Sequence, residues 1–192
     1  LGWEQVIQEK AFQLSNAGCS WSDFGTRRRF SLLVQDFVVS EMDMYKGFQG
    51  TSNPYLAFKY DVPVVGTSAH EAQMAMSAKY GVLNANRIWL EVWSDFYRGM
   101  LGIALTDTFT TDVFLRDFDG YMSRLYDGTR HDSNDPIAWG EKILSHYQQL
   151  KIDARVKRLV FSDNLNVPKY IGIHNHFVGR CIPSAGIGTN FT

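Results

Sequence analysis

The sequence predicts an α/β fold: an irregular, TIM-like (β/α) barrel core with parallel strands, incomplete at both ends. Seven short apolar runs each end in a cluster of Gly, Ser, Thr, Asp, His or Arg, and a helical pattern follows nearly every cluster. This alternation, with its short connections, favours parallel strands joined by right-handed crossovers. The clusters follow every strand, whereas a doubly wound open sheet, the main alternative, concentrates its site at one switch point.

The first half of the chain contains one recognisable helix start. The chain opens at Leu1 in a helical pattern. Asn53 and Pro54 have the residue types of an N-cap and a first helical position. A strand over Val62–Thr67 leads to a helix over Ala69–Tyr80. An extra helix over Asn84–Arg98 is expected on the outside of the fold.

The second half repeats the same unit of strand, polar cluster and helix. Strands are expected at Leu101–Asp107, Gly128–Ser133, Leu159–Asp163 and Ile182–Gly186. The helices between them are expected at Thr111–Tyr126, Asp135–Leu150 and Val167–Phe177, from apolar residues at helical spacing. Asp135 is a natural N-cap and Pro136 fits the first helical position; Pro168 lies close to the start of the last helix.

Composition limits the class of protein. At 192 residues one domain is expected, and because the chain begins without Met and ends after a glycine-rich turn, we expect residues 1–192 to be an internal piece of a longer protein. A net charge of −1 argues against a nucleic-acid or membrane-surface binder. No membrane span or secretory signal is visible. Cys19 and Cys181 lie far apart, so we expect reduced thiols in a cytoplasmic protein.

The polar clusters hold hydrogen-bond donors, cations and carboxylates, which suit a highly phosphorylated substrate. The glycines of the turn Gly186–Thr189 allow a phosphate to approach the backbone, although such turns are also common without a ligand. Arg27 and Arg28 follow Phe24, whose ring can stack on a flat ligand. At least one arginine of this run is expected in the site, while Arg29 is expected at the surface.

Further candidates follow the central strands. His70 is a phosphate ligand, a general base or a structural residue. Arg130 and Asp132, with Ser133 after them, suit ribose hydroxyls and a diphosphate, or pair with each other. Asp107 and Asp163 can hold Mg²⁺ through water.

Zinc chemistry is disfavoured. His174 and His176 lie in a helical stretch, where residues two apart diverge, so we expect surface histidines rather than zinc ligands. A barrel metal hydrolase that uses His70, His131 and Asp132 is kept as an alternative from another class.

Seven collinear segments carry a resemblance to one family: SDFGTRRRFS (Ser22–Ser31), GTSN (Gly50–Asn53), VGTSAHE (Val65–Glu71), ALTDTFTTDVFLRDF (Ala104–Phe118), RHDSNDPIAWGEK (Arg130–Lys142), LVFSDNL (Leu159–Leu165) and GIGTN (Gly186–Asn190). Together they resemble the nicotinate phosphoribosyltransferase family. The resemblance implies a type II phosphoribosyltransferase barrel with a separate domain built from the termini. It also implies the reaction: nicotinate and phosphoribosyl pyrophosphate give nicotinate mononucleotide and pyrophosphate in NAD biosynthesis, with ATP as co-substrate and Mg²⁺ carried by the substrate phosphates.

The resemblance also implies a role for each matching residue. His70 is the histidine transiently phosphorylated by ATP, and Arg130 and Asp132 are further catalytic residues. The residues expected to bind substrate are Phe24, Arg27, Arg28, Thr51, Ser52, Thr67, Asp107, Ser133, Asp163, Gly186, Gly188 and Thr189. Among these, Phe24 stacks on the pyridine ring, Thr67 lies in the nicotinate site, and the Gly186–Thr189 turn holds the 5′-phosphate.

Some features depart from the family pattern. Asn134 replaces a usual glycine, which costs least if the backbone φ is positive. Ala72 and Ala185 replace large aromatics and are expected to loosen packing near the site. The family's long N-terminal region, which completes the partner's pocket in a homodimer, and its C-terminal stretch are both missing. The chain alone is therefore expected to bind phosphorylated ligands at most. A sibling specific for nicotinamide or quinolinate is the same-class alternative.

Overall fold

The computed structural model describes residues 2–191 and confirms the α/β class with parallel strands. Its contacts group into two compact units. Unit 1 comprises the chain up to Gly66, Asn164–Val178 and the residues from Pro183 onward; unit 2 comprises Thr67–Asp163 and Gly179–Ile182. Within residues 2–191, every helix is too short or too polar to span a membrane. The prediction of a single domain stays a prediction.

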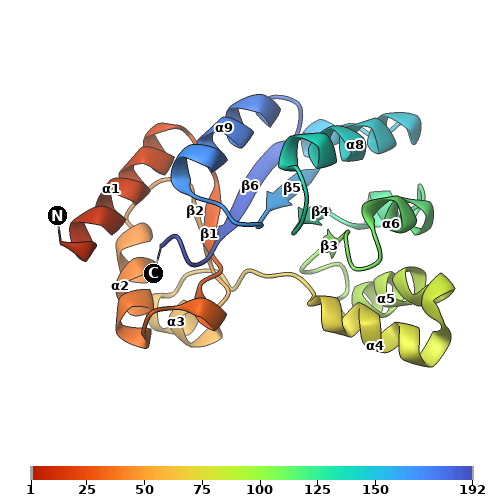
Figure 1. Cartoon of the computed structure of the whole chain (residues 1–192), viewed down its shortest axis with the longest axis horizontal. Coiled ribbons are helices and arrows are strands. Elements are labelled where there is room, and N and C mark those ends of the chain that lie inside the picture. Colours follow the sequence, from red (N-terminus) through yellow and green to blue (C-terminus); the bar gives the residue numbers. More distant parts are fainter. Residues whose placement is uncertain (1, 192) are drawn as a thin grey trace. The chain divides into compact units, whose positions relative to one another are not determined.

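Three parallel strands lie in unit 1, where β1 (Trp21–Asp23) pairs with both β2 (Phe48–Thr51) and β6, whose full span is Ile182–Ile187. The helices of this unit are α1 (Trp3–Asn16), α2 (Leu32–Met42), α3 (Pro54–Tyr60) and α9 (Val167–Phe177). α1 packs against α2 and α9 (Figure 1). The Asn53 side chain caps α3 by accepting from the amides of Tyr55 and Leu56 at 3.1 and 3.3 Å, as predicted.

The predicted strand over Val62–Thr67 is wrong. The structure keeps only a single parallel bridge, between Val64 and Thr51. Pro63 lacks an amide hydrogen and contributes its carbonyl alone, which accepts from the Thr51 amide at 3.1 Å. Among the described residues the segment forms no ladder beyond this bridge. The proline alone does not explain this, because β6 also has a proline, Pro183, as its second residue.

Unit 2 is built on β3 (Ile103–Leu105), β4 (Gly128–His131) and β5 (Arg158–Phe161), with β4 pairing in parallel to both neighbours. Its helices are α4 (His70–Tyr80), α5 (Val82–Tyr97), α6 (Thr111–Asp117), α7 (Met122–Leu125) and α8 (Pro136–Gln149). The Asp135 side chain caps α8 by accepting from the Ala138 amide at 2.7 Å. Gly128 has no room for a side chain, because a Cβ there would lie 1.9 Å from the Arg158 carbonyl oxygen.

The single helix predicted over Thr111–Tyr126 is also wrong, because the structure divides it into α6 and α7. Phe118 leaves helical geometry with ψ 62°. The Asp119 carboxylate then accepts from the amides of Tyr121 and Met122 at 2.9 and 3.0 Å, which starts a new helix. A side chain that satisfies free amides competes with continuation of the helix.

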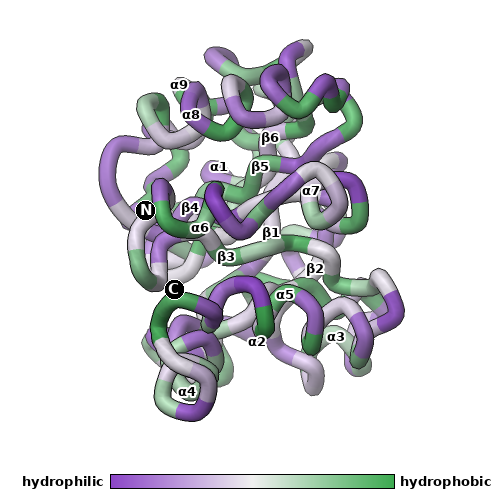
Figure 2. Tube along the Cα trace, turned by 90° about the vertical axis from the view of Figure 1, so that its right-hand side faces the viewer, coloured by the Kyte–Doolittle hydropathy of each residue, from purple (hydrophilic) through white to green (hydrophobic). Residues whose placement is uncertain are grey.

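The extra helix predicted over Asn84–Arg98 is α5, which begins two residues earlier. It packs side by side with α4 (Figure 1). Only Ala85, Asn86 and Leu90 of α5 are buried. Figure 2 shows hydrophilic and hydrophobic residues mixed along α4 and α8, as expected of helices with one face in solvent.

Candidate functional site

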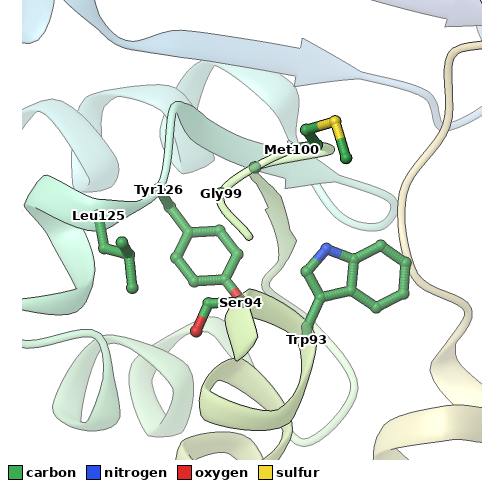
Figure 3. Close-up of a pocket in the computed structure, with 7 residues that line it drawn as sticks. Trp93, Ser94, Gly99, Met100, Leu125 and Tyr126 are labelled. Carbon is green, nitrogen blue, oxygen red and sulfur yellow. The ribbon is translucent and has the colours of Figure 1, made fainter. Parts of the chain in front are cut away.

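A small apolar hollow in unit 2 is not the functional site. Figure 3 shows the Tyr126 ring lying between Leu125 and Trp93, close to Ser94. The cavity measures about 10 Å³, which is room for about one water molecule. The Tyr126 hydroxyl donates to the Leu90 carbonyl at 2.8 Å, so this aromatic cluster serves packing.

Unit 2 instead brings polar side chains together at the carboxyl ends of its strands, around His70. His70 is the first residue of α4, and its side chain is 36% exposed. Its Nε2 lies 3.0 Å from Oδ1 of Asp107, which follows β3 and whose side chain is only 8% exposed. A carboxylate oxygen accepts, so Nε2 is the donor, and in the neutral imidazole Nδ1 is then the nitrogen with the lone pair. That Nδ1 lies 3.9 Å from Oδ2 of Asp132.

Asp107 is held from both sides. While Oδ1 faces His70, Oδ2 accepts from the Ser133 hydroxyl. Ser133 follows β4, and the next residue, Asn134, has φ 71°. The backbone is therefore left-handed at this position, where the family usually has glycine. Asn adopts this conformation at a lower energetic cost than most other residues, as expected.

Arg130 connects three segments of unit 2. Its guanidinium lies 2.9 Å from Asp132 Oδ1 and donates to the hydroxyls of Thr67 and Ser162, both at 2.7 Å. Ser162 also donates to Asp132 at 2.7 Å. The sequence predicted Arg130, Asp132 and Thr67 as site residues but not Ser162, whose only signal was its place at the end of a strand. Asp163, next to it, is half-buried.

His131 and the metal-hydrolase alternative gain no support. His131 is buried, and its Nε2 lies 3.1 Å from the Asn134 carbonyl oxygen. Burial lowers the pKa of His131. Among the residues that the structure describes, no group of three His, Cys, Asp or Glu side chains could hold a metal ion.

The expectation of two surface histidines in the last helix is wrong in part. His176 is exposed, but His174 is buried on the inner face of α9. Burial lowers the pKa of His174.

Unit 1 carries the second group of candidates, around the turn after β1. The ring of Phe24 lies directly over Gly186: a Cβ at that glycine would lie 2.3 Å from the ring. Gly188 is also close, since its Cβ would lie 3.1 Å from the Phe24 carbonyl oxygen. Thr189, beyond β6, is exposed. The absence of a side chain at Gly186 therefore admits the aromatic ring.

The arginines after Phe24 differ in exposure. Arg27 and Arg28 lie in a short 3-10 helix, η1 (Thr26–Arg28), and are exposed. The prediction for Arg29 is wrong: it is half-buried and donates to Gln35 Oε1 at 3.1 Å. A fixed Arg29 leaves its two neighbours as the exposed cations of this turn.

The loop after β2 is held by backbone and side-chain bonds. Thr51 is buried, donates to Asp23 Oδ2 at 2.6 Å and accepts from the Asn53 amide at 3.0 Å. The Ser52 amide donates to the Asp23 carbonyl at 2.8 Å. Sequence reasoning missed Asp23, a fully buried carboxylate.

Comparison with known proteins gives the family. The sequence model of the nicotinate phosphoribosyltransferase (NAPRTase) family matches residues 19–192. The chain is 49% identical over 174 residues to a nicotinate phosphoribosyltransferase of Bordetella petrii, covering 89% of this chain and 44% of that protein. It is 50% identical over 179 residues to nicotinate phosphoribosyltransferase 2 of Pseudomonas aeruginosa, covering 92% and 45%.

A solved structure agrees with the sequence comparison. The nicotinate phosphoribosyltransferase of Porphyromonas gingivalis superposes with a TM-score of 0.95 at 41% identity, covering 99% of this chain and 49% of that one. The chain thus spans about half the length of the curated relatives that it matches.

Proposed function

The chain belongs to the nicotinate phosphoribosyltransferase family, and from this we propose that the whole protein makes nicotinate mononucleotide and pyrophosphate from nicotinate and phosphoribosyl pyrophosphate, coupled to ATP hydrolysis. The observation that carries the proposal is the environment of His70. Because a buried carboxylate holds Nε2, Nδ1 is the nitrogen that, in the neutral imidazole, is suited to accept a phosphoryl group.

The first step concerns His70. Its Nδ1 lone pair forms a bond to the γ-phosphorus of ATP, the bond from that phosphorus to the β-phosphate oxygen breaks, and ADP leaves. Asp107 keeps the proton on Nε2 and stabilises the positive charge that develops on the ring. The phosphoryl group adds negative charge beside Asp132, which can reorganise the bonds that Arg130 makes.

The second step is the transfer itself. The pyridine nitrogen of nicotinate bonds to C1 of the ribose as the bond to the pyrophosphate oxygen breaks. Arg130, Asp132, Ser133 and Thr67 belong to one hydrogen-bonded group in unit 2 and are suited to hold ribose hydroxyls and the pyridine.

Unit 1 supplies the other predicted contacts. Phe24 stacks on the pyridine ring, and Arg27 and Arg28 are the exposed cations for the carboxylate and phosphates. Gly188 and Thr189, which follow β6, are suited to hold the 5′-phosphate. The predicted turn begins later than expected, because Gly186 lies within β6 beneath the Phe24 ring. Thr51 and Ser52 belong to the loop after β2 in this unit.

Mg²⁺ is part of the proposal only as a companion of the substrate phosphates, whose charge it neutralises. Both oxygens of Asp107 already bond His70 and Ser133, so direct coordination by Asp107 does not fit. Contact through water, from Asp107 or from the half-buried Asp163, is the arrangement we expect. We also propose that the whole protein is a cytoplasmic homodimer.

The test is product formation by the whole protein with nicotinate, phosphoribosyl pyrophosphate, Mg²⁺ and ATP, with nicotinamide and quinolinate in parallel. We expect product from nicotinate alone. His70→Ala should abolish acid-labile phosphorylation by ATP and the ATP stimulation, while some ATP-independent transfer survives. His176→Ala, at an exposed histidine of α9, is the matched control. A His70→Ala protein that still carries acid-labile phosphate would contradict the assignment.

A further inference from the structure

A buried carboxylate in unit 1 has no role in the reaction described above. Asp23 ends β1 and is 0% exposed. Its Oδ1 accepts from the Gly25 amide at 2.8 Å, and its Oδ2 accepts from Gln35 Nε2 at 2.7 Å and from the Thr51 hydroxyl at 2.6 Å. All three donors are uncharged, and burial raises the pKa of Asp23 while these bonds oppose the rise. Burying a carboxylate among neutral donors is costly, so packing alone does not explain the residue.

The three donors come from three different segments. Gly25 lies in the turn that carries Phe24 and the exposed arginines, and its bond to Asp23 closes a tight turn directly after β1. Thr51 lies in the loop after β2, where the Ser52 amide also donates to the Asp23 carbonyl. Gln35 lies on α2. The Asp23 carboxylate therefore connects both predicted ligand-binding segments, the turn at Gly25 and the loop at Thr51, to helix α2.

Gln35 extends this arrangement. Its Nε2 also donates to Thr26 at 3.0 Å, and its Oε1 accepts from Asn53 Nδ2 and from Arg29, both at 3.1 Å. Rotating the amide by half a turn would place donor against donor at Asn53 and Arg29 and acceptor against acceptor at Asp23. Asp23 thereby also decides the orientation of Gln35.

We infer that Asp23 is a positioning residue for substrate binding, whose carboxylate holds the Phe24–Arg28 turn and the Thr51–Asn53 loop in register for an anionic heteroaromatic ligand. The inference rests on the proposed function. It predicts an effect on the binding of nicotinate, because Phe24 and the exposed arginines sit on the turn that Asp23 closes. It predicts little effect on phosphorylation of His70, whose contacts lie in unit 2.

The experiment compares Asp23→Asn with the wild-type whole protein. The asparagine keeps the shape but offers a donor where Gln35 and Thr51 also donate. We expect the KM for nicotinate to rise about tenfold or more, with kcat at saturating nicotinate and ATP-dependent phosphorylation of His70 within about twofold of wild type. Asp36→Asn, at a residue of α2 that pairs with Lys59 at 2.7 Å, is the matched control and should leave the KM unchanged.

A double variant tests the hydrogen-bond pattern rather than the shape. In Asp23→Asn with Gln35→Glu, the carboxylate moves to residue 35, where it accepts from residue 23 and from Arg29 and Asn53. We expect this variant to recover most of the lost affinity. Gln35→Glu alone places an acceptor against Asp23, at a residue outside the predicted substrate contacts, and should also raise the KM; it decides the question if Asp23→Asn does not fold.

The outcomes separate the two proposals. Wild-type protein that makes no nicotinate mononucleotide contradicts the proposed function. Active wild type with an unchanged KM in a folded Asp23→Asn or Gln35→Glu variant overturns the inference about Asp23. A fall in kcat at unchanged KM overturns it as well, because that result would place Asp23 in the chemical step or indicate a smaller folded fraction.

Discussion

One hydrogen bond determines which nitrogen of His70 is available. Asp107 lies 37 residues along the chain and holds Nε2, so Nδ1 is the nitrogen with a lone pair when the ring is neutral. The resemblance of the VGTSAHE and ALTD segments indicated both residues. Their pairing could not be predicted, because nothing local in a sequence records which strand end lies beside the start of a given helix.

Removing the Asp132 carboxylate should lower turnover strongly while changing the stability of the fold little. Asp132→Ala removes the carboxylate that faces both Arg130 and His70, so we expect turnover to fall by about a hundredfold or more. Its side chain is 21% exposed and Arg130 keeps its bonds to Thr67 and Ser162, so stability should change little. Asp112→Ala, at an exposed carboxylate paired with Lys142, is the control. Near-normal turnover would assign Asp132 to structure.

Two buried histidines should make the protein less stable in mild acid. Burial lowers the pKa of His131 and of His174 below the value of about 6.5 in the unfolded chain. The unfolded state therefore takes up protons first as the pH falls, so the stability is present above pH of about 6.5 and is lost below it. Urea midpoints at several pH values check this. His131→Phe with His174→Phe should flatten the profile, whereas His176→Ala should not; an unchanged slope in the double variant would refute the prediction.

At the scale of elements, helices that begin with a capping residue followed by proline were predicted closely. α8 and α9 start within a residue of their expected positions. The errors have a different origin. The segment Val62–Thr67 keeps one bridge to the end of β2, and the helix at Thr111–Tyr126 is divided by the Asp119 side chain. In the second case a single side chain outweighed the periodicity of the segment.

The N-cap residue of α8, Asp135, should make a measurable contribution to the free energy of unfolding. Asp135→Ala leaves the Ala138 amide without its partner, so the free energy of unfolding should fall by about 1 kcal/mol. Asp135→Asn retains an accepting oxygen at the same position and should keep most of the stability. Urea unfolding of the three proteins measures both effects. Equal losses in the two variants would show that charge near the helix start, rather than the hydrogen bond, is what matters.

At the scale of the whole molecule, the parallel α/β architecture followed from the order of apolar runs and polar clusters, and barrel closure stays a prediction. The candidate side chains of each unit do gather: His70, Asp107 and Asp132 in unit 2, and Phe24 with Gly186 in unit 1. Asp23 was not predicted as a functional residue, because an aspartate at the end of a strand has the same sequence pattern whether its side chain faces solvent or is buried.

The rate at which the two thiols react tests whether the native fold keeps them buried. Cys19 and Cys181 are buried, and burial raises the pKa of each to about 11. The reactive species is the thiolate, so we expect very slow labelling by a disulfide reagent at pH 8 in the native protein and two thiols per chain after unfolding. Reducing agent during purification is the control for adventitious oxidation. Fast labelling of one thiol in the native state would show that its surroundings open readily.

The contact between Phe24 and Gly186 has a consequence for how the family varies. The ring occupies the space that any side chain at residue 186 would need, and an aromatic ring cannot bend aside as a flexible chain would. Positions 24 and 186 should therefore covary across relatives: a side chain larger than hydrogen at 186 should occur only with a small residue at 24. On the proposed stacking role of Phe24, relatives with such a pair should bind flat substrates less tightly.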